Sequence, residues 1–259
     1  MTMKRILILI AGFLVMTTAE GQDLAQQSLE IGVEEKLGNT IPMDIFLFNI
    51  EGDTVYLRDI YDKPTIINFV YYRCPGICSP LMDGLAEVID KSDLVIGEDY
   101  QAITISFDPR EASILAERKR NNYQNLMEKA DLAKEGWTFY TADSANIARL
   151  TDLTGFRYKP VGNDFIHSAT LIVTSPQGKI TRYLNGIYFL PFELKMSILD
   201  ANEGKTGPTI NKVLQYCYSL DPEGQAYVFN ITKVAGTLII FFGVIIFLVL
   251  ILAKRKKTK

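Results

Sequence analysis

The sequence is poor in the residues that crosslink small domains or bind metals. It contains only three cysteines and one histidine in 259 residues. Three cysteines are too few for a disulfide-stapled scaffold, and the central part of the chain is long enough to bury a complete core without one. A structural zinc site usually takes four ligands, and beside Cys74, Cys78 and His167 the sequence supplies no obvious fourth. Internal repeats, low-complexity stretches and a methionine-rich segment are also absent.

Two apolar segments flank the central part of the chain. Lys4 and Arg5 precede an apolar run over 6–15, and Thr17-Thr18-Ala19 follows it. This pattern is typical of a secretory signal peptide and is too short to span a bilayer; an uncleaved anchor is the alternative. Residues 234–253 are uncharged, and a helix of this length covers about 30 Å, the thickness of the hydrocarbon core. The basic residues of 254–259 predict that this end is cytoplasmic.

Strands and helices alternate between these segments. Residues 45–50 and 54–57 flank Glu51-Gly52-Asp53 and predict a β-hairpin. Continuous apolar runs and helical spacing predict the remaining elements. Strands are expected at 65–72, 102–107, 137–140, 169–174 and 179–184, and helices from Leu81, over 111–133, over 144–153 and over 191–199. The order β-α-β-α-β-α-β-β-α, with a cysteine pair after the first buried strand and a loop containing His167, predicts an α/β, thioredoxin-like fold.

These patterns divide the chain into six parts. They are a signal peptide (1–19), a lead-in arm (20–40), a thioredoxin-like domain (41–203), a helical extension and linker (204–233), a transmembrane helix (234–253) and a basic tail (254–259). We therefore expect a single-pass protein of the cytoplasmic membrane, in contact with lipid through its C-terminal helix, with the folded domain on the periplasmic or extracytoplasmic side. Residues 20–233 carry 30 acidic and 20 basic residues, a net charge of −10. An acidic surface repels nucleic acid, so no such partner is expected.

Cys74 and Cys78 lie where the first buried strand passes into a helix. A helix N-terminus lowers the pKa of a thiol and favours the thiolate. Redox pairs in thioredoxin-like enzymes are usually C-x-x-C, whereas three residues intervene here. Residues four apart on a helix share a face, with Cβ atoms about 5–6 Å apart. Two sulfurs in this arrangement can share a metal ion or form a disulfide, and the spacing leaves both interpretations open.

His167 precedes a strand whose preceding loop faces the cysteine turn in a thioredoxin-like sheet. Two thiolates and one imidazole form a soft, low-coordination set that suits Cu(I) and tolerates Cu(II). A lone histidine can also be satisfied by hydrogen bonds within its own loop. Its expected position opposite the thiols favours a metal site with Cys74, Cys78 and His167 as ligands.

Four segments carry a resemblance to a known family. They are 66–72, Cys74-Pro75-x-Ile77-Cys78, 105–109 and 164–168. Together they resemble the SCO/SenC family of copper-binding proteins, which assist the assembly of cytochrome c oxidase. The resemblance implies that Cys74, Cys78 and His167 bind copper and that Asp108 lies near the site or its docking surface. It also implies delivery of copper to the binuclear copper site of the oxidase's copper-binding subunit, or reduction of that subunit's cysteines.

The chain departs from this family in three ways. Family members commonly have an acidic residue in place of Gly76 and a proline in place of Ser79, and many are anchored at the N-terminus rather than the C-terminus. None of these differences removes one of the three ligands. Gly76 takes a negative charge away from the site and loosens its loop, which can alter copper affinity or redox potential.

The sequence therefore predicts a copper metallochaperone rather than an enzyme. A Cys74–Cys78 disulfide offers no thiolate, so copper loading implies a thiol reductase outside the cytoplasm. The alternative is a thiol–disulfide oxidoreductase that uses the same redox disulfide to reduce the oxidase subunit or other exported proteins. A peroxidase would need an arginine and a Thr or Ser beside one activated cysteine, and no such set stands out.

Cys217 is open to three interpretations: a buried thiol, an intermolecular disulfide partner or an accessory ligand.

Overall fold

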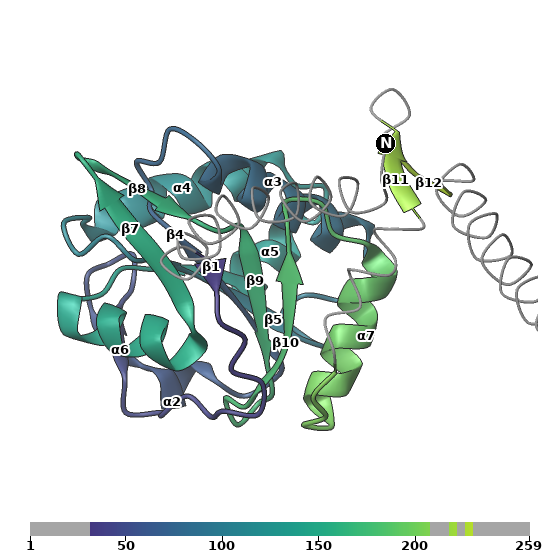
Figure 1. Cartoon of the computed structure of the whole chain (residues 1–259), viewed down its shortest axis with the longest axis horizontal. Helices are drawn as coiled ribbons and strands as arrows, with labels where there is room; N and C mark the ends of the chain where they lie inside the picture. The colour runs from purple at the N-terminus through teal and green to yellow at the C-terminus, as the bar shows by residue number, and fades with distance from the viewer. Residues whose placement is uncertain (1–31, 208–217, 222–225, 230–259) are drawn as a thin grey trace, which may run out of the picture. The chain divides into compact units, whose positions relative to one another are not determined.

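The computed structural model describes residues 32–207, 218–221 and 226–229 (Figure 1). The chain divides into two units, Met1–Gly207 and Pro208–Lys259. The predicted signal peptide (1–19), transmembrane helix (234–253) and basic tail (254–259) lie outside the described residues, as does Cys217. Within the described ranges, no helix is long and apolar enough to cross a membrane.

The first unit is built on a five-stranded sheet in the order β10-β9-β4-β5-β6. Its strands are β4 (Thr65–Val70), β5 (Gln101–Ser106), β6 (Trp137–Tyr140), β9 (Thr170–Thr174) and β10 (Ile180–Asn185). β4, β5 and β6 run parallel, while β9 is antiparallel to both β4 and β10. Every residue of β4 and β9 is buried, as expected of strands covered on both faces. This architecture confirms the predicted α/β, thioredoxin-like fold.

Six helices accompany the sheet in the described part of the chain. They are α2 (Leu57–Ile60), α3 (Cys78–Lys91), α4 (Ser113–Leu126), α5 (Ala130–Gly136), α6 (Ser144–Thr154) and α7 (Pro191–Asn202). α3 buries Leu81, Leu85, Val88 and Ile89, the residues whose spacing predicted it. α6 ends at Gly155, whose φ of 67° is a left-handed conformation that glycine adopts without strain.

The prediction of one charged helix over 111–133 is wrong, because the segment forms α4 and α5 with a break between them. At the break, the Asp90 carboxylate accepts hydrogen bonds from the backbone N–H groups of Glu128 (3.1 Å) and Lys129 (2.9 Å). Met127 is buried there in an extended conformation. A side-chain acceptor on α3 thus replaces the helical hydrogen bonds of these residues.

Two small sheets complete the first unit. β2 (Phe46–Phe48) and β3 (Thr54–Tyr56) form the predicted N-terminal hairpin. β1 (Gly32–Val33), β7 (Phe156–Val161) and β8 (Asp164–His167) form a second sheet in the order β1-β7-β8. The segment containing His167 is therefore a strand of a hairpin and not the loop that the sequence predicted. The described end of the predicted lead-in arm supplies β1, which pairs with β7.

The described residues of the second unit form one antiparallel pair. β11 (Tyr218–Asp221) pairs with β12 (Ala226–Phe229). The sequence assigned these residues to a helical extension and linker over 204–233, and here they form a pair of strands rather than a helix. Tyr, Val and Phe favour strands over helices; β11 begins with Tyr218, and β12 contains Tyr227, Val228 and Phe229.

Candidate metal centre

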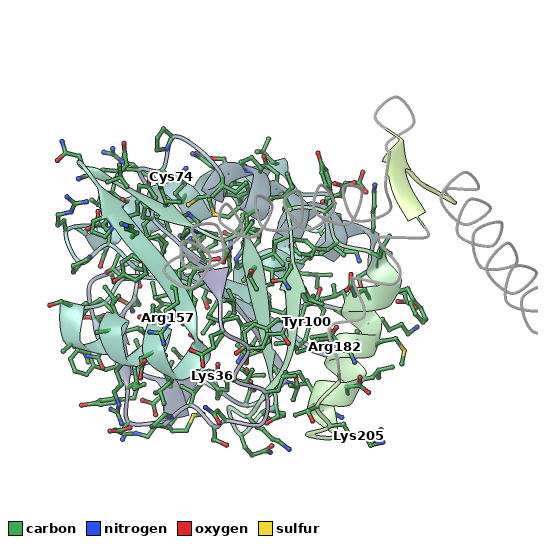
Figure 2. All side chains as sticks on the ribbon, in the orientation of Figure 1. Lys36, Cys74, Tyr100, Arg157, Arg182 and Lys205 are labelled. Atoms are coloured by element: carbon green, nitrogen blue, oxygen red, sulfur yellow. The ribbon has the colours of Figure 1, made fainter. Side chains whose placement is uncertain are left out.

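Cys74, which is labelled in Figure 2, lies between the carboxyl end of β4 and the start of α3. Beyond Val70 the chain makes a turn in which the N–H of Cys74 donates to the carbonyl of Tyr71 at 3.1 Å. Cys78 is the first residue of α3 and is 1% exposed, whereas Cys74 is half-buried. Both are free thiols, and only Cys74 offers part of its surface to solvent.

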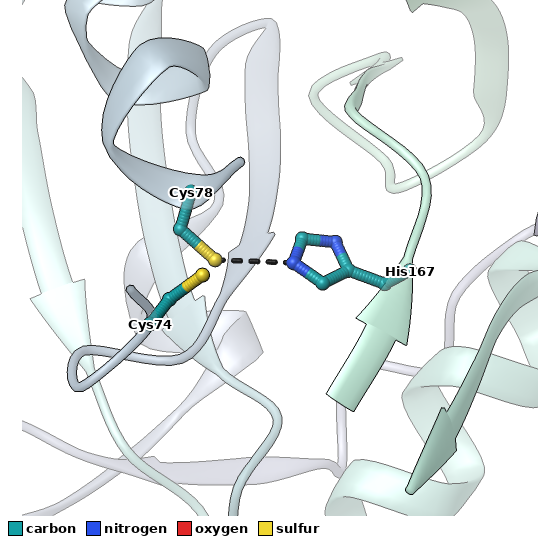
Figure 3. Close-up of side chains that lie close together, drawn as sticks. All are labelled: Cys74, Cys78 and His167. Carbon is teal, nitrogen blue, oxygen red and sulfur yellow. Dashed lines mark hydrogen bonds between the residues drawn. The ribbon is translucent and has the colours of Figure 1, made fainter. Parts of the chain in front are cut away.

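His167 approaches the two sulfurs from the other side of the site, at the end of β8 (Figure 3). Its Nε2 lies 3.1 Å from the Sγ of Cys78. The ligand atoms of Cys74, Cys78 and His167 all lie within 4.8 Å of one another and form a group that could hold a metal ion. The fold thus brings together all three residues that the sequence proposed as ligands.

Aromatic rings surround the imidazole and hold it in place. The ring centroid of His167 lies 5.1 Å from that of Phe107, 5.9 Å from that of Phe156 and 6.1 Å from that of Tyr71. Nδ1 of His167 lies 2.9 Å from the carbonyl oxygen of Ser168, which can only accept a hydrogen bond. Nδ1 therefore carries the proton, and the lone pair of Nε2 faces Cys78. This is the tautomer that a metal ligand at Nε2 requires.

The pKa values of the two thiols are shifted in opposite directions. A hydrogen bond with Cys78, together with the backbone N–H groups of Cys78 and Gly76 and a contact with Tyr71, lowers the pKa of Cys74 to about 4. The Gly76 N–H lies 3.3 Å from the Cys74 Sγ. The hydrogen bond with Cys74 and burial raise the pKa of Cys78 above its ordinary value. In the metal-free protein Cys74 is thus the thiolate and Cys78 the proton donor beside it.

This asymmetry predicts the reactivity of Cys74 toward alkylation. We expect iodoacetamide to label Cys74 at nearly the same rate at pH 6 and pH 8, because a group with a pKa of about 4 is ionised at both. An ordinary thiol loses on the order of 100-fold in rate over this interval. Peptide mapping by mass spectrometry gives the rate for each cysteine, and Cys78 should react more slowly because it is buried. The chain unfolded in urea is the control, and an equally steep pH dependence in folded and unfolded protein would contradict the prediction.

Asp108 lies near the site without being a ligand. It follows Phe107, the ring nearest to His167, and is itself buried. Its carboxylate accepts hydrogen bonds from Nε and a terminal nitrogen of Arg110 at 2.7 and 2.8 Å. Burial opposes ionisation of Asp108, but these bonds and the charge of Arg110 hold its pKa below the ordinary value. Arg110 also donates to the carbonyl of Asn163 in the β7–β8 turn at 3.0 Å.

Two features of the site were not predicted from the sequence. One is the hairpin that carries His167, and the other is the pair of hydrogen bonds that the Glu111 carboxylate accepts from the N–H groups of Tyr72 and Arg73; Glu111 was expected only as the start of a charged helix. A signal for the hairpin was present. Apolar or aromatic residues alternate with polar ones through part of 156–167, and Gly162 lies at the turn with a φ of 62°. No local pattern marked Glu111, because the backbone N–H groups that it accepts, those of Tyr72 and Arg73, are 39 and 38 residues away along the chain.

Comparison with known proteins agrees with the fold and with the sequence motifs. A family model described as SCO1/SenC matches residues 35–191, more than half of the chain. The chain belongs to the SCO1/SenC family. This confirms the resemblance drawn from the cysteine and histidine motifs.

Individual relatives match a comparable share of the chain. The SCO1 protein homolog of Bacillus subtilis (strain 168) is 25% identical over 149 residues, which are 56% of this chain and 74% of the relative. A crystal structure of a putative electron transfer protein from Aquifex aeolicus VF5 is 29% identical and covers 67% of this chain and 97% of its own, with a TM-score of 0.59. The structure of BsSco is 21% identical and covers 66% of this chain and 96% of its own. Its TM-score is 0.50, and it shares the fold.

Proposed function

We propose that this protein is a metallochaperone that carries copper in a site formed by Cys74, Cys78 and His167. The observation that carries the proposal is the convergence of two sulfurs and one imidazole nitrogen within 4.8 Å. Soft thiolate ligands select Cu(I), and an added imidazole also allows Cu(II). In the described residues this group has three members and no carboxylate, which suits low-coordinate copper better than four-coordinate zinc.

The exposure of the ligands fits transfer rather than permanent storage. Cys78 and His167 are 1% and 8% exposed, whereas Cys74 is half-buried. A partner thiolate can therefore approach copper from the Cys74 side and replace the protein ligands one at a time. A three-coordinate ion also leaves room for that incoming ligand. Ligand exchange of this kind keeps the copper bound throughout its passage between the two proteins.

The proposed recipient is the binuclear copper site in the copper-binding subunit of cytochrome c oxidase, outside the cytoplasmic membrane. BsSco is described as a member of the Sco family of cytochrome c oxidase assembly proteins, and family membership supports the same role for this chain. The apolar segments at 6–15 and 234–253 support a single-pass membrane protein with its domain on the extracytoplasmic side. A thiol reductase on that side would keep the cysteines ready for copper.

A second candidate function is thiol–disulfide exchange with the oxidase subunit or another exported protein. The specific feature that favours it is the contact between the two thiols, which lowers the pKa of Cys74 and raises the pKa of Cys78. The half-buried thiolate of Cys74 would attack a target disulfide, and Cys78 would resolve the mixed disulfide, leaving the target reduced and Cys74–Cys78 oxidised. A disulfide switch has been identified in BsSco, which shares this fold.

Copper stoichiometry of the reduced chain tests the leading proposal. We expect one Cu(I) per chain, and X-ray absorption spectroscopy should show two sulfur ligands and one nitrogen ligand. The oxidised chain is the control and should bind no Cu(I) tightly, because a disulfide provides no thiolate. A reduced chain that fails to retain copper against a competing chelator would leave only the thiol-exchange function.

A further inference from the structure

The connection between β5 and α4, residues 107–112, contacts both sides of the metal centre. On the cysteine side its key residue is Glu111, which is 5% exposed. One carboxylate oxygen accepts hydrogen bonds from the Tyr72 N–H at 2.6 Å and from the Ser106 hydroxyl at 2.7 Å. The other oxygen accepts from the Arg73 N–H at 2.8 Å. Glu111 therefore binds the backbone N–H groups of the two residues that directly precede Cys74.

These peptide groups need such a partner. β4 ends at Val70, so the N–H groups of Tyr72 and Arg73 lie beyond its hydrogen-bonding ladder. A buried peptide N–H without an acceptor costs free energy, and a carboxylate is a stronger acceptor than a neutral oxygen. With both oxygens engaged, Glu111 fixes the direction in which the chain leaves β4. That direction determines where the sulfur of Cys74 lies.

The same connection holds the histidine side. Arg110 is paired with Asp108 and donates to the Asn163 carbonyl in the turn between β7 and β8. Its guanidinium carbon also lies 5.3 Å from the ring centre of Phe165, two residues before His167. One short segment thus ties the cysteine turn and the histidine hairpin to the end of β5.

We propose that Glu111 is a positioning residue of the metal centre. It holds the cysteine turn against the segment that also anchors the histidine hairpin, and so sets the spacing between the sulfurs and the imidazole before metal binds. This inference rests on the proposed function of the same site. A preorganised ligand set binds its metal more tightly because less ordering remains to be done on binding.

Replacement of Glu111 by glutamine tests this role. Gln has the same size but only one acceptor oxygen, so an NH₂ group must face one of the two peptide N–H groups. We expect the reduced, full-length Glu111→Gln variant to lose roughly 10–100-fold in Cu(I) affinity, the range typical of residues that orient metal ligands. The thiolate-to-Cu(II) charge-transfer band should also shift, because the sulfur geometry changes. A general loss of stability would not move that band.

Glu98→Gln is the matched control. Glu98 is exposed in the turn that precedes β5. β5 has six residues, so Glu98 lies about 20 Å from the end of the strand at which the site is found. The control variant should keep wild-type affinity and the wild-type absorption band. The proposal is overturned if Glu111→Gln also keeps both while it remains folded by circular dichroism.

A second variant covers the case in which Glu111→Gln does not fold. Ser106→Ala removes one hydrogen bond to the Glu111 carboxylate and leaves the Tyr72 and Arg73 N–H groups paired with Glu111. It also removes the acceptor of the Asp108 N–H at 3.2 Å. We expect it to lose about two- to tenfold in Cu(I) affinity, the worth of the hydrogen bond to Glu111, and to shift the same band. An unshifted band and unchanged affinity in this variant would refute the proposal. If the wild-type chain itself binds no copper, the proposed function fails instead, which separates the two outcomes.

Discussion

The His167→Ala variant is expected to lose tight copper binding while its cysteines still undergo disulfide exchange. The imidazole supplies one of three ligands, and its Nε2 points at Cys78 with the other ring nitrogen held by a backbone carbonyl. Loss of a direct ligand should cost more than the ~10–100-fold that residues behind the ligands contribute, so we expect a decrease of at least about 100-fold. Competition with a Cu(I) chelator measures it. The rate of reaction with an aromatic disulfide measures thiol exchange.

Ile166→Ala is the control for this variant. Ile166 precedes His167 in the same strand, is 48% exposed and has an aliphatic side chain that cannot bind a metal. This variant should bind copper as the wild type does. Copper affinity that is unchanged in His167→Ala would show that the imidazole is not a ligand, whatever its distance from the sulfurs. A parallel loss of disulfide exchange would show that the substitution disturbs the cysteine turn as well.

The Cys78→Ser variant is expected to lose both activities. Cys78 is buried at the start of α3, and serine fits the same space without opening a large cavity. Its hydroxyl is a hard ligand that stays protonated at neutral pH, so Cu(I) keeps only one sulfur. We expect an affinity loss of more than about 100-fold. A mixed disulfide formed at Cys74 should also persist, because no second thiol resolves it. Chelator competition and trapping of the mixed disulfide on non-reducing gels measure the two effects.

Cys217→Ser is the control for the loss of a cysteine. Cys217 lies outside the described residues, and the sequence leaves it open whether this thiol is buried, paired with another molecule or an accessory ligand. With copper bound by Cys74, Cys78 and His167 alone, this variant should keep wild-type affinity and exchange rates. Copper loss in Cys217→Ser would show that the site has a fourth ligand. Retention of copper in Cys78→Ser would refute the site itself.

Local sequence patterns predicted the elements whose environment is uniform along their length. β6 has the predicted bounds, Trp137–Tyr140, and β4 and β9 were found because both faces of a central strand are buried and the run of apolar residues is continuous. α3 followed from apolar spacing at three and four residues. In each of these elements, the buried positions carry apolar residues, so the residue types alone indicate which positions are buried.

The failures lie where a distant residue decides the local conformation. Asp90 of α3 accepts the N–H groups that break the predicted long helix into α4 and α5. The β7–β8 hairpin was expected as a loop because its strands are only partly buried and include charged residues. Neither the side-chain acceptor nor the partner strand is visible in a short window of sequence.

The sequence by itself determined the chemistry of the centre. It supplied two thiols at a strand-to-helix junction and a single imidazole, and these donors select a soft metal whatever their surroundings. Only the tertiary structure decided that Cys78 and His167, 89 residues apart, lie 3.1 Å from each other. It also decided which thiol is ionised, since the pKa of Cys74 depends on donors that the folded turn supplies. Ligand identity is a property of single residues, whereas distance and proton affinity arise from contacts between segments that meet only on folding.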